Sequence, residues 1–409
     1  MATATLEQKT SRFSPGLAAW FGLLALLLAI GLYSAFRVFY YGLATTAMND
    51  TVPWGLWITI DLSSIALGAG AFTLSAVVYL FGLKRFQPIL RLAIFVGFIG
   101  YTSALLTLLM DIGRPDRFWH PWVYWNIHSV LWEITMCITI YLTIMVVEFL
   151  PVIAESPIFD GWVRFRKFAH SLHGLTPLLA ALGLGISLLH QSSLGATYGI
   201  VKARPIWFKP SMPIMFILSA IAVGPAVTMS IAFVLEWITA KRTVAHNILF
   251  AIAKTSGLTL LVYGYLRFWD AMATLYYGRT PAVEAAWELL TKNTPYNFSF
   301  WVLELIVGVL LPAVLFLSKR YNRRPIFLVL GTLLAMVGIV TNRWNVTVSG
   351  LTVPLAYSPG QLYTAPVGSY FPNATEWGIA VLIIGYGLTL LTLGVMFLPL
   401  FPKEEAQHE

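Results

Sequence analysis

Long apolar runs alternate with short polar stretches along almost the whole chain. A transmembrane helix needs about 20 consecutive, mostly apolar residues. The runs that reach this length are 16–41, 54–83, 88–112, 125–150, 168–191, 212–240, 245–272, 298–318, 325–343 and 375–400. The pattern therefore predicts an all-α, polytopic membrane protein with about ten transmembrane helices.

The spans are expected to form one integral membrane domain over residues 16–400, with short tails at 1–15 and 401–409. Inside this domain we expect two four-helix units, at about 54–191 and 212–343, and two additional helices.

A short similarity between two segments of the chain supports the two units. "NIHSVLWE" (Asn126 to Glu133) and "NFSFWVLE" (Asn297 to Glu304) each place Asn seven residues before Glu at the outer start of a span. If this similarity is a true repeat rather than a chance match, an even number of spans between the copies gives both units the same orientation in the membrane.

Composition agrees with a membrane protein, since 58% of the residues are hydrophobic and only 11% are charged. The net charge of +8 does not point to nucleic acid, because the basic residues lie in short clusters between apolar runs. With the N-terminus in the cytoplasm, fifteen of the twenty-six Lys and Arg residues lie inside and seven lie in outer loops. By the positive-inside rule, both termini are predicted to be cytoplasmic.

Several chemistries have little support. The single cysteine, Cys137, excludes an internal disulfide, a thiolate metal site and an iron–sulfur cluster held by this chain alone. Haem b needs histidines that face one another on adjacent helices, but His128, His170, His173 and His190 have no paired spacing. We therefore expect no metal, no haem and no iron–sulfur cluster in this chain.

Ionisable side chains at membrane depth are costly unless they are partnered or hydrated, so each is a functional candidate. Asp61, Glu133 and Glu304 each lie seven or eight residues from the predicted outer end of a span. At 1.5 Å per residue, this places all three about 10–12 Å below the outer surface.

Other charged groups are expected near the same surface. Arg267 and His190 lie in the last predicted turns of outward-running helices, and Asp111 and Arg114 lie at the rim. Such a cluster suits a polar-headed, lipophilic ligand such as a quinone, because Arg or His donates to a carbonyl oxygen while a carboxylate exchanges protons. In the alternative interpretation, a buried ion pair such as Asp61 with Arg267 only fixes the register of two helices.

Two charged residues lie deeper toward the cytoplasm. Lys254 is about ten residues into the seventh span, and Glu236 is about one turn from the basic pair Lys241 and Arg242. Together they could extend a proton route inward, although Glu236 could equally reach the inner interface as a snorkelling side chain.

The long outer loops 192–211, 273–297 and 344–374 are rich in Pro, Gly, Tyr and Trp. They are either a docking platform for another subunit or ordinary connections.

Five motifs carry a resemblance to a known family. In chain order they are "PWGLWITIDL", "DIGRPDRFWHP", "WNIHSVLWEITMC", "LHQSSLG" and "YGYLRFWD". They resemble the polysulfide-reductase NrfD family, especially its ten-helix branch typified by the membrane subunit of type-2 nickel–iron hydrogenase. The resemblance extends from about Pro53 to Glu304 and weakens over the last two spans.

The resemblance implies a haem-free, quinone-interacting subunit of a larger complex in the prokaryotic cytoplasmic membrane. A partner iron–sulfur subunit would pass electrons to or from menaquinone or another quinone near the outer face. By the family pattern, Asp61, Glu133, His190 and Arg267 lie in or beside the quinone pocket, and the two carboxylates handle protons. Glu304 and Glu236 are weaker matches, and Lys254 has no counterpart in the family.

Three other functions compete with this interpretation: a secondary transporter or channel, a structural anchor for a peripheral enzyme, and a haem-bearing cytochrome b. Two features argue against a transporter. The polar residues lie near one face, and no pair of helices broken by Gly or Pro recurs in the two halves.

Overall fold

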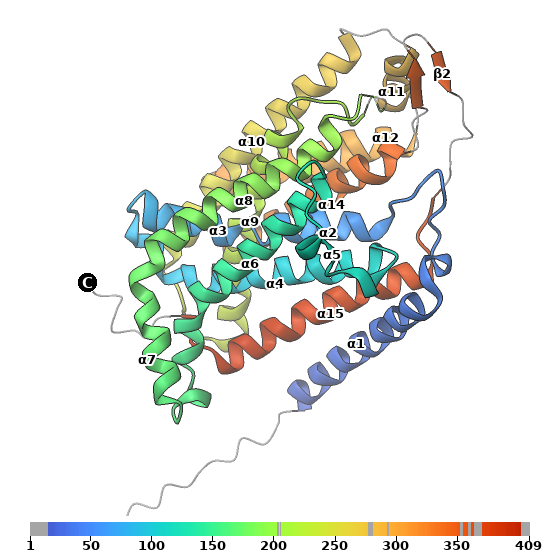
Figure 1. The fold of residues 1–409 in the computed structure, drawn as a ribbon. Coiled ribbons are helices and arrows are strands. Elements are labelled where there is room, and N and C mark those ends of the chain that lie inside the picture. Colours follow the sequence, from blue (N-terminus) through green and yellow to red (C-terminus); the bar gives the residue numbers. More distant parts are fainter. Residues whose placement is uncertain are drawn as a thin grey trace, which may run out of the picture.

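The computed structural model (Figure 1) describes residues 15–202, 204, 206–276, 281–292, 294–351, 355–358, 361–363 and 370–401. In this part of the chain, ten helices are long and apolar enough to cross a membrane, which confirms the predicted number and the all-α class. The predicted tails lie almost wholly outside the described residues.

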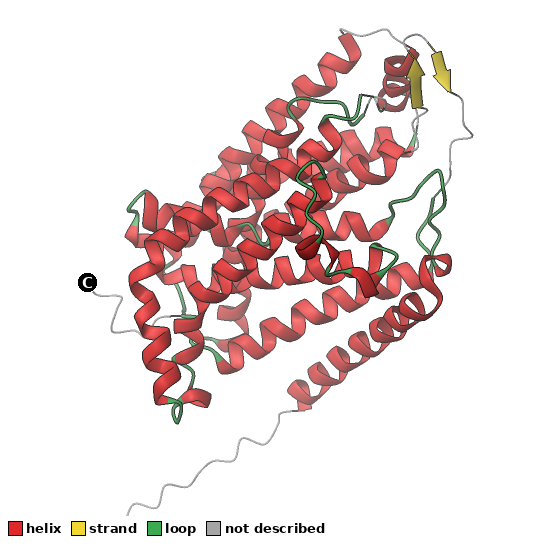
Figure 2. Ribbon diagram, viewed as in Figure 1, coloured by secondary structure: helices red, strands yellow, loops and turns green. Residues whose placement is uncertain are grey.

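Helices make up nearly all of the described structure (Figure 2). The α-helices are α1 (Pro15–Tyr41), α2 (Leu56–Leu67), α3 (Gly70–Ser75), α4 (Gln87–Asp111), α5 (His120–Val123), α6 (Val130–Ala154), α7 (Val163–Ser171), α8 (Thr176–Gly199), α9 (Met212–Thr239), α10 (His246–Tyr276), α11 (Pro281–Thr291), α12 (Pro295–Phe298), α13 (Leu311–Leu317), α14 (Pro325–Trp344) and α15 (Ala374–Phe397). Three π-helical segments are η2 (Ala76–Leu80), η7 (Ser299–Leu310) and η8 (Asn345–Ser349). Short 3-10 turns are η1 (Gly42–Thr45), η3 (Lys84–Phe86), η4 (Pro115–Arg117), η5 (Pro157–Phe159) and η6 (Leu172–Leu175). Strands β1 (Leu355–Ser358) and β2 (Gln361–Tyr363) pair as a small antiparallel hairpin.

The membrane helices pack in two neighbouring groups. We call α2–α3, α4, α6 and α8 the first group, and α9, α10, α12–η7–α13 and α14 the second group. Helices α8 and α3 pack on α9 and join the groups, while α1 packs on α15 and α15 packs on α4. That the groups are repeats of one unit stays a prediction.

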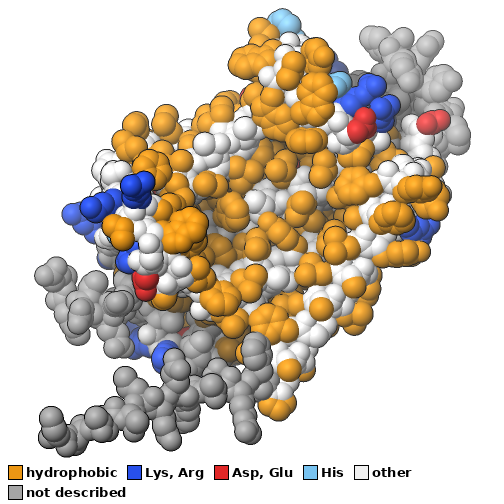
Figure 3. Space-filling view, turned by 60° about the horizontal axis from the view of Figure 1, so that its bottom comes forward, with side chains coloured by type: hydrophobic (Ala, Val, Ile, Leu, Met, Phe, Trp, Pro, Cys, Tyr) orange, Lys and Arg blue, Asp and Glu red, His pale blue; other side chains and the backbone are white. Residues whose placement is uncertain are grey.

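The surface matches a bilayer environment. Hydrophobic side chains cover the broad face seen in Figure 3, and Lys and Arg side chains gather at its two ends. On α1, large apolar residues such as Leu32, Tyr33 and Phe36 are exposed. Exposed apolar side chains on a helix of this length are what lipid contact requires.

The predicted bounds of the fourth and fifth spans were wrong. The fourth span begins at Val130 rather than at 125, because the Ser129 side chain caps the helix by accepting a hydrogen bond from the backbone N–H of Trp132. The fifth span runs from Thr176 to Gly199 instead of 168–191, and Pro177 lies in its first turn. The basic segment before it forms the separate short helix α7.

The second group depends on one very close helix crossing. A Cβ atom built on Gly308 of η7 would overlap the Cα atom of Gly338 on α14. Small residues at such crossings let helix backbones approach closely in membranes. Glycine at both positions is therefore required by the distance between the backbones.

We predict that Gly308→Ala lowers the free energy of unfolding by about 1–3 kcal/mol, the usual cost of overpacking. Thermal unfolding of the purified protein measures the effect. Gly22→Ala is the matched control, because a Cβ atom there meets nothing within 4 Å. Equal melting temperatures for the two variants would contradict the prediction.

Candidate functional site

The second group holds a complete polar network around Glu304. This residue lies in η7, and its side chain is 1% exposed. Its Oε1 atom accepts hydrogen bonds from Arg267 Nε at 2.6 Å, Asn342 Nδ2 at 2.9 Å and the Tyr263 hydroxyl at 3.1 Å. Its Oε2 atom accepts from Asn345 Nδ2 at 3.2 Å. A buried carboxylate with four donors, one of which is a cation, is fully satisfied.

The network continues from Arg267 toward the C-terminal end of α10. Arg267 Nη1 donates to Asp270 Oδ2 at 2.8 Å, and Lys209 Nζ donates to the same oxygen at 2.6 Å. The Arg267 guanidinium also lies 4.9 Å from the centre of the Phe300 ring. Two carboxylates and two cations therefore balance one another within this network.

The first group, by contrast, contains buried polar atoms that lack a hydrogen-bond partner. In the described part of the chain, Asp61 Oδ1, Asp111 Oδ1, the Tyr101 hydroxyl, and both polar side-chain atoms of His190 and of Gln191 have no hydrogen-bond partner. These residues come from α2, α4 and α8. Because buried polar groups are nearly always hydrogen-bonded, such a concentration indicates a place that binds water or a polar ligand.

Two tyrosines and a histidine pack together in this region. The ring centres of Tyr101 (α4) and Tyr141 (α6) are 4.5 Å apart, and those of Tyr101 and His190 (α8) are 5.8 Å apart. His190 and Tyr101 are both 0% exposed. Their polar atoms can donate to a carbonyl oxygen, which is the requirement stated above for a quinone head.

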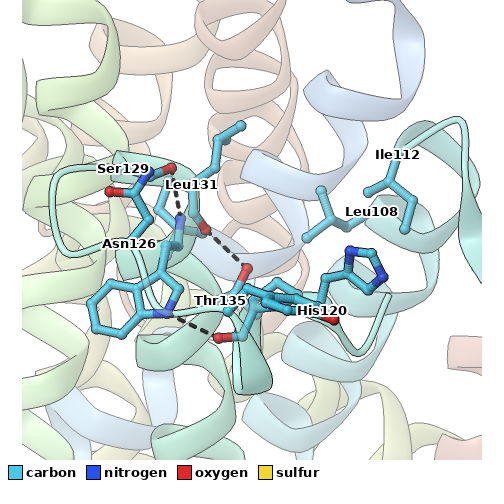
Figure 4. Close-up of a pocket in the computed structure, with 11 residues that line it drawn as sticks. Leu108, Ile112, His120, Asn126, Ser129, Leu131 and Thr135 are labelled. Atoms are coloured by element: carbon cyan, nitrogen blue, oxygen red, sulfur yellow. Dashed lines mark hydrogen bonds between the residues drawn. The ribbon is translucent and has the colours of Figure 1, made fainter. Parts of the chain in front are cut away.

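A cavity of ≈ 330 Å³ lies between the C-terminal end of α4 and the N-terminal end of α6, and its lining includes residues of α5 (Figure 4). Its walls include Leu108 from α4 and Ile112 just after it, His120 from α5 and Tyr124 just after α5. The following loop and α6 contribute Asn126, Ser129, Leu131, Trp132, Ile134 and Thr135. The volume is within the range of about 300–1,000 Å³ found for small-molecule sites.

The cavity and the tyrosine pair lie on the same helix faces. Leu108 precedes the end of α4 by three residues, and Tyr101 lies seven residues, or about 10 Å, further inward on the same face. Ile134 and Tyr141 have the same relation on α6. Tyr101 and Tyr141 therefore lie on the inward continuation of the cavity walls.

Two carboxylates flank the cavity. Asp111 lies in the α4 turn that contributes Leu108 and Ile112, and Glu133 lies between the lining residues Trp132 and Ile134. The Ser193 hydroxyl on α8 donates to Glu133 Oε1 at 2.6 Å. Asp61 is near enough to Asp111 for their charges to interact.

A third carboxylate borders Asp111 at the rim. Glu376 is 0% exposed at the start of α15, where it accepts hydrogen bonds from the backbone N–H groups of Ala47 and Asn373 and from the Tyr370 hydroxyl. Burial raises the pKa of Tyr370 above its ordinary value, so its hydroxyl keeps the proton that it donates to Glu376.

The structure separates Arg267 from the other three residues that were expected to share one cavity. Arg267 belongs to the Glu304 network, Glu133 bonds to Ser193, His190 packs on Tyr101, and Asp61 lies near Asp111. The expected cluster was therefore wrong in its inclusion of Arg267, and a common site for Asp61, Glu133 and His190 stays a prediction. The alternative, an Asp61–Arg267 pair, was also wrong, because the partner of Arg267 is Glu304.

The distances of these residues from their helix ends differ from the expected ones, and a common depth in the membrane stays a prediction. Glu133 is in the first turn of α6, about 5 Å from its start, while Asp61 is about 8 Å into α2. Glu304 lies nine residues after Pro295, where its span begins. His190 precedes the end of α8 by nine residues instead of lying in its last turn.

Three further candidate site residues do not join these clusters: two pair with a nearby side chain and the third is exposed. Arg114 pairs with exposed Asp116 at 3.0 Å, not with Asp111. Glu236 Oε2 lies 2.9 Å from His246 Nε2 at the inner ends of α9 and α10. The Lys254 side chain is exposed on α10 and is not part of a buried route.

Several residues of these clusters are not evident from the sequence. Tyr101, Tyr141 and Gln191 look like ordinary residues of apolar helices, and only their packing reveals them. Asn342 and Arg343 are recognisable in the sequence, because two adjacent strongly polar residues near the end of an apolar run are unusual in a membrane helix.

Comparison with known proteins gives one family match. The profile of the family "Polysulphide reductase, NrfD" matches residues 44–355. The integral membrane subunit of menaquinone reductase from Nitratidesulfovibrio vulgaris is 32% identical over 393 residues, which cover 94% of this chain and 92% of that protein.

Two other relatives match over similar lengths. One subunit of selenate reductase from Mesobacillus selenatarsenatis is 26% identical over 95% of this chain and 96% of its own length. The probable Ni/Fe-hydrogenase 2 b-type cytochrome subunit from Escherichia coli is 26% identical over 90% of each chain.

We predict that Glu304→Leu destabilises the protein by about 3–5 kcal/mol, because it leaves Arg267 buried without its main counter-charge. The double variant Glu304→Leu/Arg267→Met should recover much of this loss, as measured by thermal unfolding. Glu288→Leu removes an exposed ion pair with Lys292 and is the matched control. An unchanged melting temperature for Glu304→Leu would show that the network does not stabilise the fold.

Proposed function

We propose, from the premise that this chain belongs to the polysulphide reductase NrfD family, that it is the quinone-reacting membrane subunit of a multi-subunit oxidoreductase. The chain is an integral membrane protein with ten candidate spans. The name of the menaquinone reductase relative supports a quinone, and menaquinone is the first candidate. We place the protein in the cytoplasmic membrane of a prokaryote with both termini inside.

The observation that carries the proposal is the group of buried, unpartnered polar atoms beside the outer cavity. An apolar opening that leads toward a few convergent polar groups is the usual form of a small-molecule site. Asp61, Tyr101, His190 and Gln191 supply donors and acceptors, and the cavity walls supply apolar surface. These residues fit a quinone, whose ring is apolar and whose two carbonyl oxygens accept hydrogen bonds.

Each group has a distinct role in this proposal. The ring enters between α4 and α6 from the lipid, because exposed residues such as Leu131 and Tyr124 form the rim of the cavity. Tyr101 and His190 donate hydrogen bonds to a carbonyl oxygen and orient the ring. Reduction of a quinone takes up two electrons and two protons. Asp61, Asp111 and Glu133 hold and release these protons near the outer surface.

Electrons come from, or leave to, a separate partner protein. We propose an iron–sulfur subunit that docks on the outer face, where Phe118, Trp119 and Tyr124 are exposed beside the cavity. Exposed aromatic residues are typical of protein interfaces as well as of the membrane boundary. The outer loops that were expected to form a platform are described only in part.

The proposed function needs no haem in this chain, although one relative is named a b-type cytochrome subunit. Among the histidines whose side chains are described, only His190 is buried. A haem b held by two histidines within the bundle needs two that face each other. The arrangement of His120, His128, His170 and His246 therefore supports the haem-free proposal.

We predict that Asp61→Asn lowers quinone turnover by about 100-fold, because the amide cannot exchange a proton. The measurement is quinone-dependent turnover by the intact complex at several pH values. Asp50→Asn, at an exposed outer position, is the matched control. A transporter or a purely structural anchor predicts no difference between these variants, and such a result would remove Asp61 from the mechanism.

Glu133→Gln should also lower turnover while the complex still assembles. The amide oxygen still accepts the hydrogen bond from Ser193, so the link between α6 and α8 is kept and only the ionisable group is lost. Turnover is measured across pH, with Glu288→Gln on α11 as the control. Turnover that matches the control at every pH would exclude a proton-transfer role for Glu133.

A further inference from the structure

Helix α7 lies at the end of the bundle where α6 finishes and α8 begins. Helix α6 ends at Ala154 and α8 starts at Thr176, so the nine residues of α7 belong to the connection between two membrane spans. Figure 1 shows α7 running across the direction of α4 and α15 at this end of the molecule. Since the spans on either side cross the bilayer, this position puts α7 at the boundary between lipid and water.

The sequence of α7, "VRFRKFAHS", puts basic and apolar residues on different sides of the helix. Phe165 and Ala169 are four residues apart and share the face that packs on the protein, where Ala169 is buried. Arg164 and Lys167 are three residues apart and share an exposed side, and Phe168 is exposed beside Arg164 at the i+4 position. A basic helix with aromatic residues next to its cations is typical of a segment that lies in the plane of a bilayer surface.

Aromatic packing and one ion pair fix the position of α7. The ring centre of Phe159 in η5 is 5.8 Å from that of Trp162 and 5.2 Å from that of Phe165. Arg166 Nη1 donates to Asp160 Oδ1 at 3.0 Å, which links α7 to the residue that follows η5. The helix is therefore held in place without the two exposed cations, which stay available for a ligand.

The two exposed cations lack a counter-charge from their own segment. Among the described residues, no carboxylate forms an ion pair with Arg164 or Lys167. The sequence contains no Asp or Glu from 161 to 235, and the preceding carboxylate, Asp160, already pairs with Arg166. Two neighbouring cations without a local acid create a positive potential at the bilayer boundary.

Large apolar side chains are exposed around these cations. Ile158 in η5, Trp162, Val163 and Phe168 are each more than half exposed. In water this apolar area would be unfavourable, but aromatic side chains are enriched where the ends of membrane helices meet lipid headgroups. The combination of free cations and exposed apolar side chains therefore fits a lipid better than a soluble anion.

We propose that α7 is an interfacial helix that binds the headgroups of anionic phospholipids through Arg164 and Lys167. The Arg164 guanidinium donates hydrogen bonds to the phosphate oxygens, and the Lys167 ammonium adds a second positive charge. Trp162, Val163 and Phe168 contact the apolar part of the same lipid layer. The site follows the C-terminal end of α6, whereas the cavity lies at the N-terminal end of that helix, so this inference does not rest on the proposed function.

The test uses the full chain in nanodiscs of phosphatidylcholine, with or without phosphatidylglycerol. Native mass spectrometry measures which lipid stays bound, and thermal unfolding measures the stabilisation that it gives. We expect Arg164→Gln/Lys167→Gln to lower the preference for phosphatidylglycerol about tenfold or more, because each cation near an anionic surface contributes to binding. Lys319→Gln/Arg323→Gln is the matched control. It removes two exposed cations from the connection between α13 and α14, four spans later and therefore on the same side of the membrane domain.

Two further measurements separate a lipid from a soluble anion. Inorganic phosphate added to phosphatidylcholine nanodiscs should not raise the melting temperature of the wild type, because free phosphate leaves the apolar side chains uncovered. A nitroxide label on Phe168→Cys should be more accessible to oxygen, which concentrates in lipid, than to a water-soluble nickel complex. Cys137 is buried and should not react with the label. Stabilisation by phosphate, a label that lies in water, or equal lipid preferences for the two double variants would each overturn the inference.

Discussion

The absence of water in the bilayer core is the constraint on which the structure depends. Every polar group inside must find a partner within the protein. Most hydroxyl groups meet this requirement within their own helix: Ser63 donates to the carbonyl of Thr59 at 2.6 Å, and Thr107 donates to that of Ser103 at 2.7 Å. Because hydrogen bonds within the same helix are available, a buried polar side chain without a partner indicates a place that binds water or a polar ligand.

The two helix groups meet this constraint in different ways. In the second group, Glu304, Arg267, Asp270 and Lys209 form a closed network in which the charges cancel. A satisfied buried network holds one arrangement of its helices. In the first group, the polar atoms of Asp61, His190 and Gln191 face no partner, so this region gains most from a hydrated or ligand-bound state. Under the proposed function, the second group therefore supports the fold and the first group holds the ligand.

The fold was more accessible to prediction than the site. Ten spans follow from length and hydropathy alone, but their ends depend on local features such as the Ser129 cap and Pro177. The partner of Arg267 could not be read from the sequence, because Glu304 reaches it from a π-helical segment whose register differs from that of an α-helix. Tyr101 and Tyr141 have the composition of core residues, and only three-dimensional packing places them beyond the cavity.

The positions of the carboxyl groups bear on how the reaction can move charge. Asp111 and Glu133 lie beside the cavity, so under the proposed function proton exchange with the nearby surface is a short path. On the inner side, Glu148 accepts a hydrogen bond from Ser75 at 3.4 Å and lies seven residues, or about 10 Å, inward from Tyr141 on the same face of α6. A reaction that draws protons from the cytoplasm must carry them across this interval, where the helix faces are mainly apolar. Under the proposed function, coupling to charge movement therefore requires hydration between Tyr141 and Glu148, in addition to the chemistry beside the cavity.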